Sequence, residues 1–90
     1  MKKILIVEDD KGIAELERDY LEASDFSVDI AADGRVGLQK ALNWDYSLLL
    51  LDIMLPEEDG ISILKKLRSK SDTKDLPVIM LTAKGTEYDK

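Results

Sequence analysis

Three apolar runs of the sequence are followed by side chains whose oxygen atoms can bind a cation, attack a substrate or form hydrogen bonds. The first run is followed by Glu8, Asp9 and Asp10, the third by Asp52, and the fourth by Thr82. Carboxylates bind divalent cations or act as nucleophiles, and a hydroxyl group donates a hydrogen bond to an anion. The positions of these residues therefore predict a site that is built from oxygen ligands at the ends of strands.

The elements that must position these residues follow from the hydrophobic pattern. Strands are predicted over Lys3 to Val7, Phe26 to Ala31, Ser47 to Leu51 and Pro77 to Leu81, and helices over Lys11 to Ala23, Asp33 to Asn43 and Gly60 to Ser69. Apolar runs of this kind are typical of strands that are buried on both faces of a parallel sheet. Strands that alternate with helices pair in parallel through right-handed crossovers. We therefore predict an α/β fold with a doubly wound parallel sheet.

Each helix is expected to turn one apolar stripe toward this sheet. The stripes are Ile13, Leu16, Tyr20 and Leu21 in the first helix, Val36, Leu38, Ala41 and Leu42 in the second, and Ile61, Leu64 and Leu67 in the third. Gly34 and Gly37 are expected to weaken the second helix, because glycine disfavours helical backbone. The polar segment 85–90 could begin a fourth helix.

The strand ends predict a shared acidic pocket. In open parallel sheets, ligands bind outside the carboxyl ends of the strands, where the strand order reverses. If the first and third strands are neighbours, Glu8, Asp9 and Asp52 lie together and repel one another unless a cation intervenes. Mg²⁺ suits such a site because it prefers oxygen ligands. The alternative is that these acids are helix caps or solvated loop residues, and Asp10 is a candidate cap for the helix that begins at Lys11.

Composition excludes several classes of function. The net charge of −6 argues against direct contact with nucleic acid, and the chain of 90 residues contains neither histidine nor cysteine. It therefore has no imidazole base, thiol nucleophile or thiolate metal site. No apolar run is long enough to cross a bilayer, and none has the form of a signal peptide, so we expect a cytoplasmic location.

Three segments of the chain resemble the signatures of one family, in the family's order. They are Ile4-Leu5-Ile6-Val7-Glu8-Asp9-Asp10, then Leu51-Asp52-Ile53-Met54-Leu55-Pro56 with Asp59-Gly60, and then Pro77-Val78-Ile79-Met80-Leu81-Thr82-Ala83-Lys84. Together they resemble the receiver domain of two-component response regulators, in the branch whose output domain is a winged helix. The resemblance spans the whole chain and implies a flavodoxin-like sheet and a role in the regulation of transcription.

The resemblance also implies roles for individual residues. Asp52 would be the phosphoacceptor, Asp9 would bind Mg²⁺ directly, and Glu8 would bind it through water. The backbone carbonyl of Met54 would be a further ligand of the metal. Thr82 would hydrogen-bond the phosphoryl group and move toward it in the active state.

The donor of the phosphoryl group would be a phosphohistidine on a partner histidine kinase, since this chain has no histidine. Such a domain is a switch rather than an enzyme. A phosphatase of the haloacid-dehalogenase type is disfavoured, because its general acid would fall at Met54. A flavodoxin-like nucleotide binder needs a phosphate loop rich in Ser, Thr and Gly after the first strand, where this chain has acids. A receiver-derived fragment or scaffold without a working switch remains an alternative.

A complete receiver would extend beyond Lys90 through a fifth strand and a fifth helix, and that strand would carry a lysine that pairs with the phosphoryl group. Residues 1–90 are therefore expected to form the N-terminal portion of a receiver, incomplete at the C-terminus. The fourth strand would then have an open edge, and open edges invite association. We expect self-association through the fourth-strand edge, or packing against another chain.

Overall fold

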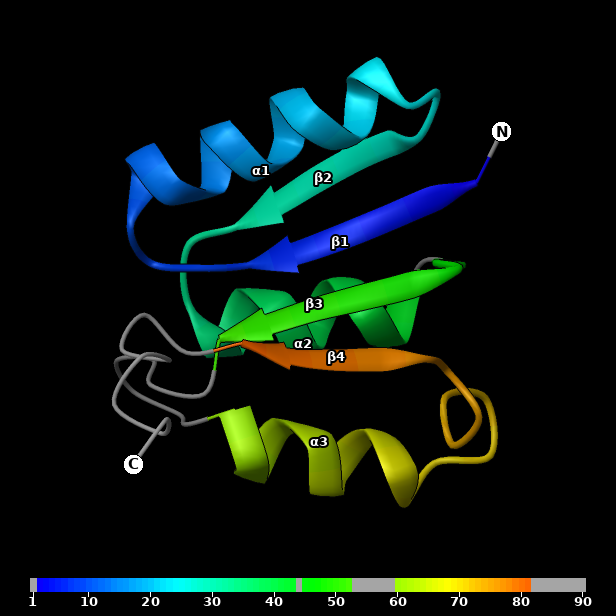
Figure 1. The fold of residues 1–90 in the computed structure, drawn as a ribbon. Helices are drawn as coiled ribbons and strands as arrows, with labels where there is room; N and C mark the ends of the chain where they lie inside the picture. The colour runs from blue at the N-terminus through cyan, green and yellow to red at the C-terminus, as the bar shows by residue number, and fades with distance from the viewer. Residues whose placement is uncertain (1, 44, 53–59, 82–90) are drawn as a thin grey trace, which may run out of the picture.

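The computed structural model describes residues 2–43, 45–52 and 60–81, and within them the chain folds as one parallel sheet flanked by helices (Figure 1). The elements are β1 (Lys3–Val7), α1 (Lys11–Ala23), β2 (Ser27–Ala31), α2 (Gly34–Asn43), β3 (Leu48–Asp52), α3 (Gly60–Arg68) and β4 (Val78–Leu81). The strand order is β2-β1-β3-β4. The α/β fold with a doubly wound, flavodoxin-like parallel sheet is confirmed. The predictions for Met54, Thr82 and the segment 85–90 lie outside the described residues.

The pairing of β1 with β3 brings the acidic strand ends together. Val7, the last residue of β1, is in register with Leu51 of β3, so Glu8 and Asp52 follow at the same edge of the sheet. β1 holds this position because its four residues Ile4, Leu5, Ile6 and Val7 are buried on both faces. β2 lies at the edge of the sheet and β3 in its interior.

Two helices begin at the same edge of the sheet with aspartate caps. The Asp10 carboxylate accepts a hydrogen bond of 3.0 Å from the backbone N–H of Ile13, and this bond begins α1. The Asp33 carboxylate accepts one of 2.9 Å from the backbone N–H of Val36 at the start of α2. Each cap satisfies an N–H group that has no partner within the helix. The prediction that Asp10 is a helix cap is confirmed.

The two faces of the sheet carry separate apolar clusters. Leu5, Val7, Ala31, Ala41, Tyr46, Leu49, Leu51, Ile63 and Leu67 form the larger buried cluster, which lies under α2 and α3. Ile4, Ile6 and Ala14 form the smaller one under α1, with partly buried Leu21, Phe26, Val28, Ile30, Leu48 and Leu50 packed against it. Helices therefore lie on both faces of the sheet, but the two faces are not covered equally.

The predicted inner stripe of α1 is wrong for three of its four residues. Ile13, Leu16 and Tyr20 are exposed, while Leu21 is partly buried. The residue that faces the sheet most closely is Ala14. A small side chain allows the helix to approach the strands, and the larger apolar residues then lie along its flank.

The predicted stripe of α2 is also partly wrong, for a similar reason. Val36 and Leu42 are exposed, whereas Ala41 is buried and Leu38 packs against the core as expected. Gly37 is buried, and a Cβ atom at this position would lie 2.7 Å from a γ-carbon of Val7. This glycine therefore allows α2 to contact β1 closely, which offsets its low helix propensity.

In α3, the prediction is correct for Leu67 and Leu64 and wrong for Ile61. Leu67 is fully buried and Leu64 packs against the core, but Ile61 is exposed and Ile63 takes its place inside. Ile63 and Leu67 are four residues apart, which places them on one side of a helix.

β4 is less buried than its apolar sequence indicates. Ile79 is exposed, although its pattern predicts a strand that is buried on both faces. Ile79 is in register with Leu50, so it belongs to the face on which α1 lies. Within the residues that the structure describes, no helix lies over this part of the sheet (Figure 1).

No helix in the described part of the chain is long and apolar enough to span a membrane.

Candidate functional site

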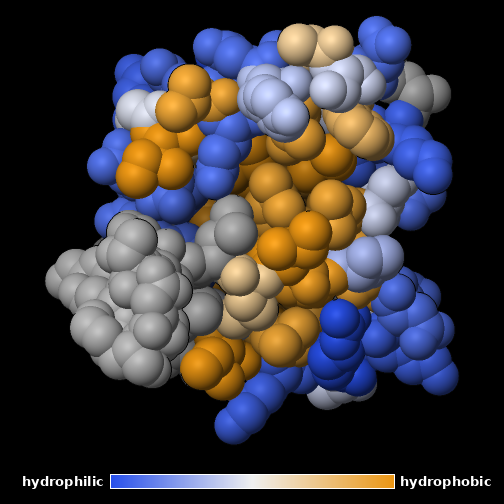
Figure 2. Space-filling model, viewed as in Figure 1, coloured by the Kyte–Doolittle hydropathy of each residue, from blue (hydrophilic) through white to orange (hydrophobic). Residues whose placement is uncertain are grey.

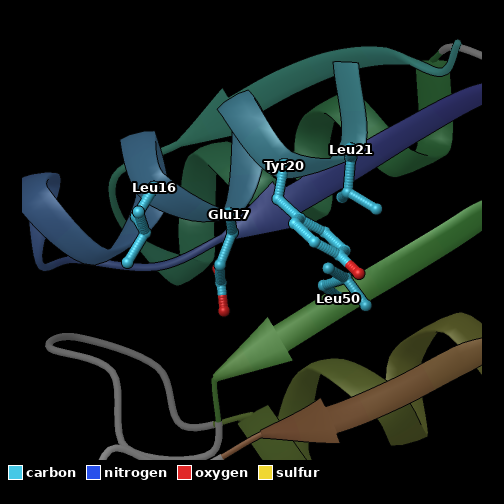
Figure 3. Close-up of a pocket in the computed structure, with 5 residues that line it drawn as sticks. All are labelled: Leu16, Glu17, Tyr20, Leu21 and Leu50. Atoms are coloured by element: carbon cyan, nitrogen blue, oxygen red, sulfur yellow. The ribbon is translucent and has the colours of Figure 1, made fainter. Parts of the chain in front are cut away.

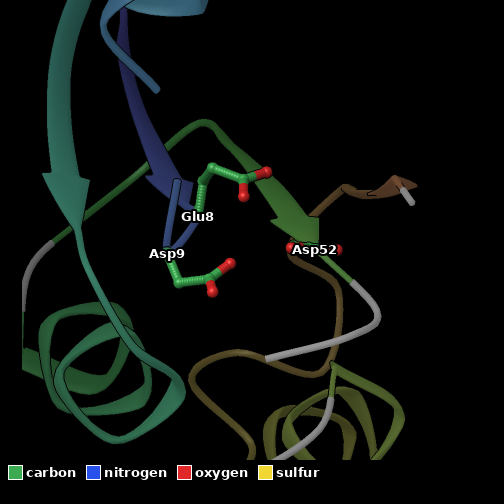
Figure 4. Close-up of side chains that lie close together, drawn as sticks. All are labelled: Glu8, Asp9 and Asp52. Atoms are coloured by element: carbon green, nitrogen blue, oxygen red, sulfur yellow. The ribbon is translucent and has the colours of Figure 1, made fainter. Parts of the chain in front are cut away.

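Glu8, Asp9 and Asp52 form a compact acidic cluster at the carboxyl edge of the sheet (Figure 4). Each offers a carboxylate oxygen, and these oxygens all lie within 4.8 Å of one another. Glu8 and Asp52 are buried, with exposed fractions of 6% and 3%, while Asp9 is exposed. The structure thus brings together the three acidic side chains that the sequence predicts to meet, and the pocket is open on the side of Asp9.

Burial raises the pKa of the Glu8 carboxyl to about 7. Repulsion by Asp52 and hydrogen bonds with the carboxyls of Asp52 and Asp9 act in the same direction. A hydrogen bond of 3.1 Å from the backbone N–H of Asp10 to Glu8 opposes the rise, because it stabilises the carboxylate. Ionisation of all three carboxyls in this cluster is therefore unfavourable.

The residues of this cluster fit a hard divalent cation. Three carboxylates with oxygens this close match the ligands of Mg²⁺, which takes oxygen donors and retains several waters. A metal that prefers nitrogen or sulfur ligands would find none among these side chains. A bound cation would also offset the repulsion by Asp52, which adds to the effect of burial on the pKa of Glu8.

Asp10 does not belong to this cluster, because its carboxylate caps α1. The alternative interpretation of the strand-end acids as helix caps thus holds for Asp10 and not for its two neighbours, Glu8 and Asp9.

One carboxyl near the site is not among the residues predicted from the sequence, and it belongs to Glu17 on α1. Its Oε1 atom is buried and has no hydrogen-bond partner among the described residues. Burial, and to a smaller extent the negative charge of Asp52, raises the pKa of Glu17. A signal for it existed, because Glu17 is three residues after Ala14 and four before Leu21, which is the spacing of one helix face.

The sequence of this chain also matches a known family. The model of the response regulator receiver domain matches residues 4–90. The chain belongs to this family. Receivers of known structure share its fold, and the response regulator TrrA from Thermotoga maritima, crystallised in complex with Mg²⁺ and BeF, superposes with a TM-score of 0.88 at 34% identity. The match covers 98% of this receiver and 75% of that chain.

Curated relatives of this receiver are response regulators. The response regulator ArlR of Staphylococcus saprophyticus is 46% identical over 90 residues, which is all of this chain and 40% of the relative. The transcriptional regulatory protein DltR of Streptococcus agalactiae is 47% identical over 88 residues, covering 98% of this chain and 38% of the relative. The receiver described here spans about 40% of the length of these relatives.

Proposed function

We propose that this receiver accepts a phosphoryl group on Asp52 from a phosphohistidine of a partner histidine kinase. The observation that carries the proposal is the position of Asp52, which is buried at the end of interior strand β3 with oxygens of Glu8 and Asp9 within 4.8 Å. The exposed Asp9 marks the side from which a donor reaches the pocket.

In the proposed transfer, a carboxylate oxygen of Asp52 forms a bond to phosphorus as the phosphorus–nitrogen bond of the donor breaks. The imidazole of the donor histidine leaves with the electron pair of that bond. The nucleophile and the phosphoryl group are both anionic, so their approach requires the neutralisation of charge. Glu8, Asp9 and Asp52 would hold Mg²⁺, which supplies that neutralisation when it is bound.

The local geometry favours Asp52 over its acidic neighbours as the acceptor. Glu8 accepts a hydrogen bond from the backbone N–H of Asp10, which engages one of its carboxylate oxygens and makes it a weaker nucleophile. Asp9 follows Glu8 after the end of β1, and Figure 4 shows it across the cluster from Asp52 at the end of β3. By resemblance to the family, the backbone carbonyl of Met54 would complete the metal site, and Thr82 would bind the phosphoryl group.

Two comparisons support the proposal. The solved TrrA structure carries Mg²⁺ with BeF in a fold like this one, and the curated relatives are response regulators and transcriptional regulators. We infer that this chain is the receiver portion of a cytoplasmic regulator of transcription, and that it acts as a switch without turning over a substrate of its own. Phosphorylation would add about two negative charges to the acidic edge.

A second candidate function is that of a receiver-derived scaffold which associates without a working switch. The exposed Ile79 on β4 favours it, because this side chain belongs to a sheet face that is not fully covered. The scaffold and the switch differ in whether Asp52 is modified.

The test is the intact mass of the chain after incubation with acetyl phosphate and Mg²⁺. We expect one phosphoryl adduct that disappears when Mg²⁺ is chelated and is absent from the Asp52→Asn variant. Asp72→Asn removes an exposed acid in the loop before β4 and should leave the adduct unchanged, so it is the matched control. An adduct that persists in Asp52→Asn would contradict the assignment, and no adduct in any variant would favour the scaffold.

A further inference from the structure

Hollows lie on both flanks of α1, and they differ in charge. The hollow over β3 is a groove of about 450 Å³ with Glu17 as the one charged group in its lining (Figure 3). It belongs to the apolar surface that extends from α1 toward β4 (Figure 2). The hollow on the β2 side is smaller, about 270 Å³, and lies where α1 begins, between the ends of β1 and β2. Its charged lining residues are Glu8, Asp9, Lys11 and Glu15.

The hollow on the β2 side adjoins the acidic cluster. Glu8 and Asp9 belong both to the cluster and to the lining of this hollow, and Asp9 is exposed. A molecule in the hollow therefore contacts side chains whose oxygens lie within 4.8 Å of a carboxylate oxygen of Asp52. The rest of the lining is apolar and consists of Ala14, Ile30 and Ala32.

Lys11 is the one positively charged residue among the described residues that line this hollow. Its side chain is exposed, and it takes part in none of the ion pairs found in the described part of the chain. Glu15 follows one turn later, but lysine before glutamate is the less favourable order for a pair on a helix. The ammonium group can therefore move, on its flexible four-carbon stem, over the mouth of the hollow.

The position of Lys11 opposes the dipole of its helix. It is the first residue of α1, and the first turn of α1 contains no acidic residue. The N-terminus of a helix carries partial positive charge, so a cation there is unfavourable unless nearby acids offset it. Glu8 and Asp9, which line the same hollow, supply this offset. Residues that break a local preference in this way are often functional.

We propose that Lys11 is a specificity-determining residue that binds short-chain acyl phosphates, such as acetyl phosphate, at the entrance to the acidic pocket. The inference rests on the proposed function of Asp52. Such a donor has a dianionic phosphoryl group, which matches the ammonium group of Lys11, and a short apolar chain, which matches the apolar lining of the hollow.

The proposed transfer from an acyl phosphate changes no bond of Lys11. A carboxylate oxygen of Asp52 forms a bond to phosphorus, and the bond from phosphorus to the acyl oxygen breaks. The carboxylate of the donor leaves with the electron pair of that bond. Lys11 holds the donor by charge alone, so its contribution should depend on the charge of the donor and on salt.

The charges at the site explain why one ammonium group matters. Glu8, Asp9 and Asp52 carry three negative charges when all are ionised, so with Mg²⁺ bound the cluster retains one. The charge of Lys11 offsets this last one, and a dianionic donor then meets a site without net charge. A unit charge that acts on a dianion across a few ångströms of water changes its binding by about three- to tenfold.

The test is the rate of modification of Asp52, followed by intact mass at saturating Mg²⁺ over a range of acetyl phosphate concentrations. We expect the second-order rate constant of Lys11→Gln to be about three- to tenfold below that of the parent chain, and the difference to shrink in high salt. Lys11→Arg keeps the charge and should restore most of the rate. Phosphoramidate, which carries less negative charge and has no acyl group, should show a smaller loss in Lys11→Gln.

The binding of Mg²⁺ separates this role from general damage to the site. The loss of a positive charge beside the cluster should tighten Mg²⁺ binding in Lys11→Gln by about twofold, measured from thermal melts over a Mg²⁺ titration, whereas a distorted cluster would bind Mg²⁺ more weakly. Lys70→Gln is the matched control, because it removes an exposed lysine from the connection between α3 and β4, at the opposite edge of the sheet. It should leave the rate and the Mg²⁺ affinity unchanged.

The outcomes distinguish the inference from the proposed function on which it rests. Equal acetyl phosphate rates in the parent chain and in Lys11→Gln would overturn the inference alone, and so would a loss of rate that Lys11→Arg does not restore. The absence of an adduct on Asp52 in the parent chain would overturn the proposed function, and the inference with it.

Discussion

Four consecutive leucines of β3 alternate between the two faces of the sheet, and helices cover these faces to different extents. They are Leu48, Leu49, Leu50 and Leu51. Leu49 and Leu51 point toward α2 and α3 and are fully buried, whereas Leu48 and Leu50 point toward the α1 side and are only partly buried. Residue type and strand are the same for all four. The presence of a helix above a position therefore decides its burial, and the hydrophobic pattern alone does not.

The largest difference between the two faces should appear when single leucines of β3 are shortened. Leu49→Ala should lower the free energy of unfolding by about 2–5 kcal/mol, because it leaves a cavity in a closed core. Leu50→Ala should cost roughly half as much or less, because the side chain is already partly in contact with water. Urea denaturation at low protein concentration measures both.

Equal losses for the two variants would contradict the comparison, since they would show that the α1 side is as well covered in solution as the other.

The acidic cluster at the carboxyl edge of the sheet should make the free energy of unfolding depend on pH. The folded state holds a proton on Glu8 up to about pH 7, above the ordinary value of 4.5, so it binds more protons than the unfolded state between these values. The contribution of Glu8 to the free energy of unfolding is therefore most favourable below about pH 4.5, and it falls as the pH rises from there through 7. Integrated over this shift, the loss is at most about 3 kcal/mol. Thermal melts without divalent cations measure it.

Two variants separate the contributions to this pH dependence. Glu8→Gln should flatten most of the slope, and Glu17→Gln a smaller part, because the pKa of Glu17 is also raised. Millimolar Mg²⁺ should reduce the loss near pH 7 by stabilising the ionised cluster, and Asp9→Asn should blunt this gain. A stability that rises from pH 5 to 7.5 without Mg²⁺ would disprove the electrostatic description of the cluster.

A smaller effect should distinguish two glycines of helices on opposite faces. Gly37→Ala should destabilise the chain by about 1–3 kcal/mol, because the new methyl group would lie 2.7 Å from the branched, buried side chain of Val7. Gly12→Ala should instead be neutral or stabilise by up to about 1 kcal/mol, since its Cβ would meet only an Asp10 oxygen at 3.4 Å. Chemical denaturation of both variants checks the opposite signs.

The strands and the acidic cluster could be predicted because each depends on a simple rule. Parallel strands place their carboxyl ends at one edge, so the acids after β1 and β3 had to meet once those strands were neighbours. The spacing of Glu17 from Ala14 and Leu21 places it on the inner side of α1. Its missing hydrogen-bond partner among the described residues depends on packing, and the spacing of residues does not predict it.

The inner faces of the helices were harder to predict, and the errors share one cause. The sequence pattern weights large apolar residues such as Leu16 and Val36, but α1 and α2 approach the sheet through Ala14 and Gly37. Small side chains reduce the distance between helix and strand, and the bulky residues beside them then lie at the flank. The exposure of Leu16 and Tyr20 also depends on which part of a protein covers β3 and β4. The hydrophobic pattern of α1 carries no information about that part.

The strand order has a consequence for the time course of synthesis. β1 is made first, yet it lies between β2 and β3, so one of its edges has no partner until residue 52 has been added. At about 5–20 residues per second, that interval is a few seconds. Throughout it, Glu8 and Asp9 are solvated without Asp52 nearby, and the three charges meet only when the apolar residues of β3 dock on β1. In the nascent chain, the three carboxylates therefore begin to repel one another only when the apolar contacts between β3 and β1, which offset this repulsion, also form.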